Sequence, residues 1–139
     1  MGMFAAMHYW WPKMFGRMYD RGKAFVSWAI IFVGFNALYF PMLVIGIQGM
    51  PRRYHDYLPQ YHTGHVISTV GSWILVAGML LMFYNLFKAM KKGKPVGMNP
   101  WGGATLEWAT PSPPPTLNFV GEPVLERGPY DYKGVVADE

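Results

Sequence analysis

The sequence predicts an all-α membrane protein with two transmembrane helices, an N-terminal half-helix and an extended, proline-rich tail. Two long stretches, residues 24–51 and 57–87, contain no charged residue. Only 14% of the 139 residues are charged, whereas an average soluble protein has roughly 25%. The tail holds most of the twelve prolines and few aliphatic runs. These observations favour a chain that spans a membrane over a soluble domain.

The N-terminal segment is too short to cross a bilayer. Residues 1–11 are apolar but would form only about 17 Å of helix, roughly half of a membrane. The segment lacks the basic start and the cleavage pattern of a signal peptide. A helix that ended inside lipid would leave amide groups unpaired, so another segment must cover it. We therefore expect residues 1–23 to be the end of a membrane helix and a basic loop, within a larger protein.

The first spanning helix is predicted over residues 24–47. At 1.5 Å per residue it would be about 36 Å long, enough to cross a hydrocarbon core of about 30 Å. Pro41 removes a backbone hydrogen bond late in this helix and is expected to bend it. Asn36, one turn earlier, has two interpretations: a hydrogen bond between helices, or a position beside a cofactor or a water chain.

A second spanning helix is predicted over residues 65–87, after a turn at residues 48–64. Basic residues flank the two helices on the far side from this turn: Lys13, Arg17, Arg21, Lys23, Lys88, Lys91, Lys92 and Lys94. The positive-inside rule therefore places both chain ends in the cytoplasm and the turn outside. Arg52 and Arg53 on the turn oppose that rule. Guanidinium groups bind carboxylates or phosphates bidentately, so a bound partner explains them better.

The tail, residues 88–139, begins with a basic flank and becomes proline-rich. The run Pro-Ser-Pro-Pro-Pro at residues 111–115 is expected to be extended polyproline II. Such a tail cannot build its own core, so we expect it to lie along the cytoplasmic face of a partner. The net charge of +4 does not indicate nucleic acid, because the basic residues form no single stripe.

Few residues of the chain suggest independent chemistry. His62 and His65 have the spacing of two metal ligands on one helical face, or are polar residues at a membrane interface. The absence of cysteine excludes disulfides, thiolate metal sites and a cysteine nucleophile. No phosphate-binding loop, nucleophile elbow or carboxylate pair is present. The sequence therefore predicts no self-sufficient active site.

Four motifs, in order, resemble subunit I of the haem–copper oxidases. They are HYWWPKMFGRMYD at residues 8–20, FVGFNALYFP at 32–41, GMPRRYHDY at 49–57 and NPWGGATLEW at 99–108, followed by PSPPP. The resemblance covers nearly the whole chain. It implies that the chain comprises the end of helix ten, helices eleven and twelve and the cytoplasmic tail of a twelve-helix bundle.

The resemblance also implies which cofactors the complex holds. Subunit I of this family carries a low-spin and a high-spin haem, of a-type in cytochrome c oxidases, and copper. Their ligands would lie in the preceding part of the subunit, about ten helices, so this chain is expected to ligate no haem iron or copper. That part would come from a separate chain, through a split gene, or was lost by truncation.

Several residues match family positions near the haems. Arg52 and Arg53 match the arginines that bond the haem propionates, and the alternative from the residues alone is a cap that binds lipid headgroups. Tyr39 and Met42 align with positions that flank the low-spin haem. The resemblance therefore implies that these four residues contact cofactor, with no catalytic residue in this chain.

Two further features of the turn follow from the resemblance. In some members, the carbonyl at the position of His55, together with Asp56, helps bind a calcium or sodium ion. Gly64 and His65 depart from the family, which usually has Trp-Asn at the start of helix twelve. Local packing there is therefore expected to differ.

The resulting hypothesis is that the chain forms the C-terminal segment of subunit I of a proton-pumping cytochrome c oxidase in a bacterial inner membrane. Its partners would be the rest of subunit I, subunits II and III, cytochrome c as donor and the lipid bilayer. Alternatives are a quinol oxidase subunit I segment, a two-helix structural or assembly protein without haem, and a nonfunctional remnant. Pro51 in the arginine turn favours cytochrome c over quinol.

Overall fold

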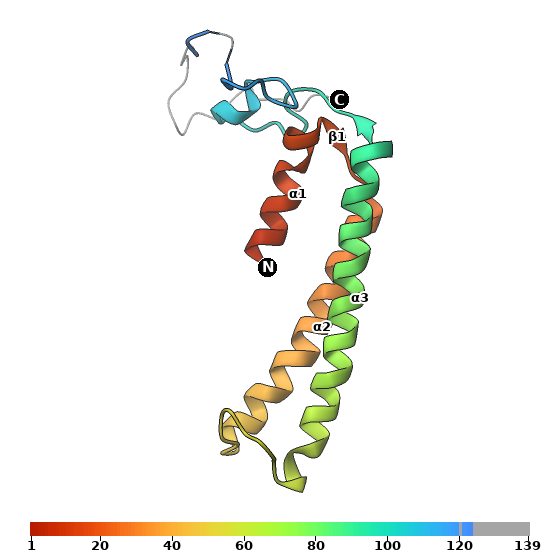
Figure 1. Ribbon diagram of the computed structural model, residues 1–139, viewed down its shortest axis with the longest axis vertical. Coiled ribbons are helices and arrows are strands. Elements are labelled where there is room, and N and C mark those ends of the chain that lie inside the picture. Colours follow the sequence, from red (N-terminus) through yellow and green to blue (C-terminus); the bar gives the residue numbers. More distant parts are fainter. Residues whose placement is uncertain (120, 124–139) are drawn as a thin grey trace. The chain divides into compact units, whose positions relative to one another are not determined.

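The computed structural model describes residues 1–119 and 121–123 and is mostly helical (Figure 1). The elements are α1 (Gly2–Phe15), β1 (Arg17–Met18), α2 (Arg21–Ile47), α3 (His62–Lys92) and β2 (Lys94–Pro95), with 3₁₀ turns at Pro59–Tyr61 and Leu106–Trp108. This confirms the predicted all-α fold class, apart from the two short strands. The rest of the predicted tail lies outside the described residues.

The two long helices are long and apolar enough to cross a membrane. α2 begins at Arg21 rather than at residue 24, and α3 runs from His62 to Lys92 rather than over residues 65–87. Both helices therefore continue beyond their charge-free stretches, because lysine and arginine are good helix formers in water. α2 continues through Pro41, which lies inside it. Most of the large apolar side chains on both helices are exposed, so this chain covers little of their surface.

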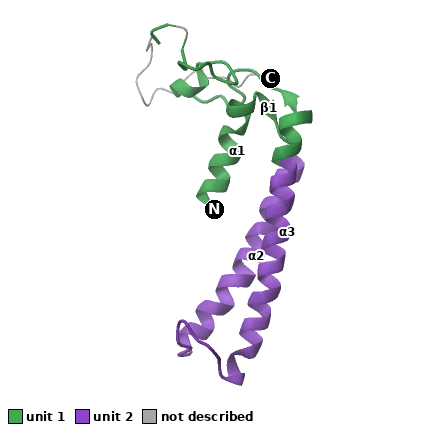
Figure 2. Cartoon of the chain, in the orientation of Figure 1, with its two compact units in different colours: residues 1–20, 86–139 green, residues 21–85 purple. Residues whose placement is uncertain are grey.

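The described chain divides into two compact units, coloured separately in Figure 2. Unit 2, residues 21–85, is a hairpin of α2 and the greater part of α3. A methyl group added at Gly71 would lie 2.5 Å from the backbone of Ala37 and Leu38, and one added at Gly34 would overlap the backbone of Leu75. Because only glycine fits at these two positions, the backbones of the two helices approach each other directly.

Unit 1 combines residues 1–20 with the chain from residue 86 onward. β1 pairs with β2 in antiparallel register, Arg17 opposite Pro95 and Met18 opposite Lys94. The backbone amide of Val96 donates to the carbonyl of Gly16 at 3.2 Å. The chain that follows α3 is thus hydrogen-bonded to the segment that follows α1.

The described part of the tail contacts this chain's own first helix, α1. Its expected position along the face of a partner stays a prediction. The indole nitrogen of Trp101 donates to the carbonyl of Tyr9 at 2.8 Å, and that of Trp108 donates to the Tyr9 hydroxyl at 2.9 Å. The Trp108 side chain is only 2% exposed. The tail docks on this chain's own first helix because α1 presents aromatic residues that the two indoles can cover and bond.

Candidate functional site

The turn after α2 begins with a defined helix cap. The amide of Met50 donates to the carbonyl of Ile45, and that of Gly49 donates to the carbonyl of Gly46, both at 3.1 Å. Gly49 has φ +94°, in the region that glycine occupies without strain. This pattern is the Schellman motif, which satisfies the last carbonyls of a helix and reverses the chain. The cap fixes the direction in which the arginine segment leaves α2.

The turn is also tied down from the side of α3. The hydroxyl of Tyr61, in the 3₁₀ turn before α3, donates to the carbonyl of Gln48 at 3.0 Å. The Tyr61 side chain is 5% exposed, so this bond is protected from water. Both ends of the turn are therefore anchored, which limits the positions that its central residues can take.

Arg52 and Arg53 follow directly on this cap, and both are exposed. Within the part of the chain that the structure describes, neither guanidinium has a hydrogen-bond or ion-pair partner. The nearest acid in sequence is Asp56, whose carboxylate instead accepts the amide of Tyr57 at 2.8 Å. Arg53 has φ +55°, a left-handed conformation that is uncommon for a residue with a side chain. Two cationic forks are thus presented at the turn.

One histidine of α3 contacts the residues on both sides of the arginine pair. His65 Nε2 lies 3.0 Å from the sulfur of Met50, and its Nδ1 lies 3.5 Å from the hydroxyl of Tyr54. An imidazole ring can make both contacts at once, with one ring nitrogen donating and the other accepting. The ring of Tyr57 lies 4.2 Å from the His65 ring. The Tyr57 hydroxyl lies 3.2 Å from Nδ1 of His62.

The remaining predicted residues are placed as follows. Tyr39 and Met42, three residues apart on α2 and so on one face, are 51% and 39% exposed. Both are therefore available to a molecule outside this chain. His55 and Asp56 are exposed on the turn. No group of three His, Cys, Asp or Glu side chains that could hold a metal ion occurs among the described residues.

The chemistry of the turn fits haem propionates. A guanidinium donates bidentately to a carboxylate, and each of the two exposed forks can hold one such group. The exposed Tyr39 adds a flat apolar side chain on α2, suited to packing against a flat cofactor. The arrangement can bind and orient an anionic group.

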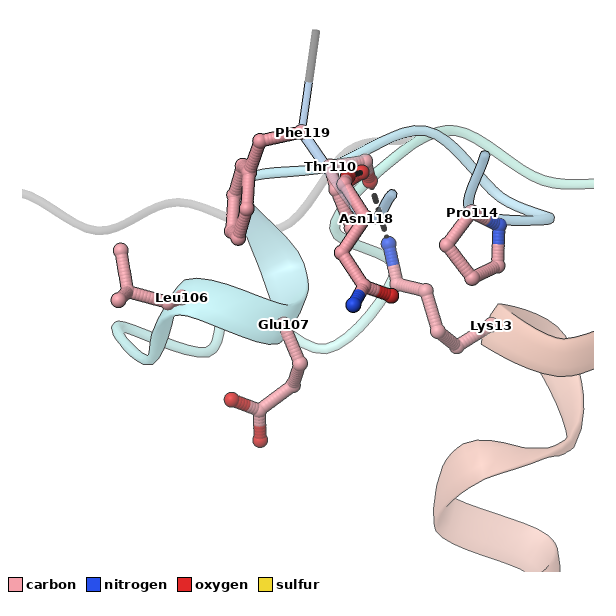
Figure 3. Close-up of a pocket in the computed structure, with 7 residues that line it drawn as sticks. All are labelled: Lys13, Leu106, Glu107, Thr110, Pro114, Asn118 and Phe119. Carbon is pink, nitrogen blue, oxygen red and sulfur yellow. Dashed lines mark hydrogen bonds between the residues drawn. The ribbon is translucent and has the colours of Figure 1, made fainter. Parts of the chain in front are cut away.

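A cavity of about 250 Å³ lies in unit 1 (Figure 3). Its lining residues are Lys13, Leu106, Glu107, Thr110, Pro114, Asn118 and Phe119. The Lys13 side chain is directed at the carbonyl of Thr110, 2.6 Å away. We interpret this cavity as a packing feature of the docked tail.

Sequence reasoning missed the contacts of His65. The metal hypothesis had paired this residue with His62, but the structure directs the two rings at Tyr54 and Tyr57. Gly49 after an apolar run was a signal for the helix cap. No sequence signal gave the partners of His65, because they depend on the path of the turn.

Comparison with known proteins gives one family. The model of cytochrome c and quinol oxidase polypeptide I matches residues 1–74. One similar relative is cytochrome c oxidase subunit 1 of Thermostichus vulcanus, which is 40% identical over 94% of this chain and 24% of the relative. Another is cytochrome c oxidase subunit 1 of Bacillus subtilis, which is 40% identical over 85% of this chain and 20% of the relative. Probable cytochrome c oxidase subunit 1-alpha of Streptomyces avermitilis is 44% identical over 87% of this chain and 22% of the relative. The chain spans about a quarter of the length of these relatives or less.

Proposed function

Because the chain belongs to the family of cytochrome c and quinol oxidase polypeptide I, we propose that it forms the C-terminal part of the catalytic subunit of a proton-pumping cytochrome c oxidase. Such a complex passes electrons to oxygen, which is reduced to water, at a-type haems and copper. The rest of subunit I would supply the haem and copper ligands. Subunits II and III would complete the complex.

In this proposal, Arg52 and Arg53 hold the haem propionates. The observation that carries it is a capped, doubly anchored turn that presents two guanidinium groups without a partner among the described residues. An adjacent cation favours the ionised form of a carboxylate, and bidentate bonds fix its orientation. The two residues would keep the propionates charged and the haem edges in place. Tyr39 and Met42 would form part of the wall beside the low-spin haem.

The test is the reduction potential of each haem in the oxidase purified from its native membrane. Arg52→Met and Arg53→Met each remove a positive charge that disfavours the oxidised, more positive haem. We expect each variant to lower the potential of one haem by tens of millivolts, on the order of 50 mV, in a spectroelectrochemical titration. Haem content per complex checks that assembly is unchanged.

Lys91→Met is a matched control, because it removes an equal charge from the exposed last turn of α3. It should leave both potentials unchanged. Unchanged potentials in both arginine variants, with normal haem content, would contradict propionate binding by this turn. Purification of the chain without haem and without a helical partner would contradict the oxidase assignment and favour a structural role.

The second part of the proposal concerns the electron donor of the complex, cytochrome c or quinol. The family description names both cytochrome c and quinol oxidases, and three relatives are named as cytochrome c oxidases. We propose cytochrome c on that support. Oxygen uptake by the purified complex with reduced cytochrome c, and no uptake with a ubiquinol or menaquinol analogue, is the expected result; the reverse would identify a quinol oxidase.

Two smaller proposals concern the turn and the membrane. His55, through its carbonyl, and Asp56 would help hold a calcium or sodium ion, with further ligands from outside this chain. Asp56→Asn should then weaken calcium binding to the purified complex. The two apolar helices belong to a membrane protein, and we propose the bacterial inner membrane with both chain ends in the cytoplasm.

A further inference from the structure

The arginine pair sits in a short segment whose two flanking residues contact one side chain. Met50 precedes the pair and contacts Nε2 of His65 at 3.0 Å through its sulfur. Tyr54 follows the pair and contacts Nδ1 of the same ring at 3.5 Å, with the two ring centroids 5.2 Å apart. His65 thus closes the segment from Met50 to Tyr54 into a loop with the arginines at its tip.

The backbone inside this loop is not in a relaxed conformation. Arg53 has φ +55°, where the β-carbon crowds the following carbonyl oxygen. Residues keep such conformations only where the surrounding structure determines them, and they cluster at functional sites. The helix cap at Gly49 fixes the segment before the pair, but it does not reach Tyr54. After the pair, Tyr54 is the residue that contacts His65.

A second tyrosine supports the His65 ring from the side. Tyr57 packs at 4.2 Å from the His65 ring and stacks at 6.3 Å on that of His62. Both histidines lie in the first turns of α3, a helix with a continuous backbone ladder. The first turns of α3 therefore contact the turn on the side that follows the arginine pair.

From these contacts we infer that His65 is a positioning residue for the arginine pair: by holding Met50 and Tyr54, it sets the direction in which Arg52 and Arg53 present their guanidinium groups. The inference rests on the proposed function, in which those groups bind haem propionates. It assigns no direct contact between His65 and haem. Its effect must therefore pass through the arginines.

The experiment uses the complete oxidase purified from its native membrane, with His65→Phe as the main variant. Phenylalanine keeps an aromatic ring but loses both nitrogen contacts. We expect the potential of the haem that responds to Arg53→Met to fall as well, by a smaller amount than in Arg53→Met. His65→Gln, which keeps a donor and an acceptor, should lower the potential less than His65→Phe does. His62→Phe, which loses only the contact with Tyr57, is the matched control and should leave the potential unchanged.

A double-mutant cycle decides whether His65 acts through Arg53. In the Arg53→Met background, His65→Phe should cause no further shift. A full additional shift in that background, or no shift from His65→Phe alone, would overturn the inference. Unchanged potentials in the arginine variants themselves would instead contradict the proposed function, so the two failures are distinguishable.

If His65→Phe lowers the haem content, Tyr54→Phe and Met50→Leu take its place in the cycle. Each removes one contact of His65 and keeps nearly the same side-chain volume. We expect each to give part of the His65→Phe shift, again absent in the Arg53→Met background. A haem reduction potential that is unchanged in both variants would overturn the inference.

Discussion

The ammonium group of Lys13 lies 2.6 Å from the carbonyl oxygen of Thr110, a residue 97 positions later in the chain. The same group donates to the carbonyl of Met98 at 2.8 Å and lies 5.1 Å from the centre of the Trp108 ring. Lys13 is 6% exposed and Thr110 is 5% exposed. Carbonyl dipoles and the face of an indole stabilise a cation removed from water. The described tail is thus held on α1 by a buried charge.

Lys13→Met should loosen the tail. The carbonyls of Met98 and Thr110 would lose a charged donor, at a cost of about 1–3 kcal/mol for a buried acceptor. We expect a glutamate-specific protease to cleave after Glu107 about ten- to a hundredfold faster, because cleavage follows the population of the open form. Mass spectrometry of the fragments identifies the site. Lys91→Met is the control, and an unchanged cleavage rate in Lys13→Met would show that the charge does not hold the tail.

Gly71→Val should disrupt the hairpin of unit 2. A β-carbon at this position would lie 2.5 Å from the backbone of α2, and forcing the helices apart costs about 1–3 kcal/mol. We expect the amount of chain in the membrane, measured by immunoblot, to fall several-fold. Gly46→Val is the matched control within this chain, because no atom lies within 4 Å of its added carbon. Equal loss in both variants would argue against a specific contact.

Thiol labelling can test the orientation of the helices. The chain contains no cysteine, so single cysteines can be introduced without background from its own sequence. In intact cells, His55→Cys should react with a membrane-impermeant maleimide, whereas Glu107→Cys should react only after permeabilisation. The reverse pattern would contradict the positive-inside prediction.

Gly49→Ala should weaken the arginine turn through the backbone alone. No atom lies within 4 Å of the added carbon, but φ +94° is unfavourable for alanine. The strain is about 1–2 kcal/mol, so we expect the haem absorbance of the purified complex to be lost at a lower temperature. Gly46→Ala, inside α2, should not have this effect. The same temperature in both variants would mean that the cap does not support the haem site that we propose.

The two spanning helices were predictable from sequence because charged side chains are unfavourable in the hydrocarbon core of a membrane. Long stretches without charged residues therefore indicate the parts that span it. Their ends were less predictable. Hydropathy marks only the apolar part of a helix. The helix α3 extends beyond that part, from His62 to Lys92, because backbone hydrogen bonds can still form there. The N-terminal half-helix was likewise expected over residues 1–11, but α1 runs to Phe15 with Pro12 inside it.

The docking of the tail could not be predicted. Lys13 was interpreted as a basic flank of a membrane helix, since such flanks are common and its carbonyl partners are 85 and 97 positions away. The arginine pair stood out because two cations on an outward turn need a partner. Their support by His65 depends on the fold of the turn, which no local pattern encodes. Propionate binding by Arg52 and Arg53 stays a prediction.

The close approach of α2 and α3 at Gly34 and Gly71 has a consequence for every ligand of this hairpin. Where two helix backbones touch, no layer of side chains remains between them, so no molecule can be enclosed at these two crossings. A cofactor edge or a lipid tail must bind there on the outer faces of unit 2. The surfaces of α2 and α3 that face away from each other are where partners of the hairpin should be sought.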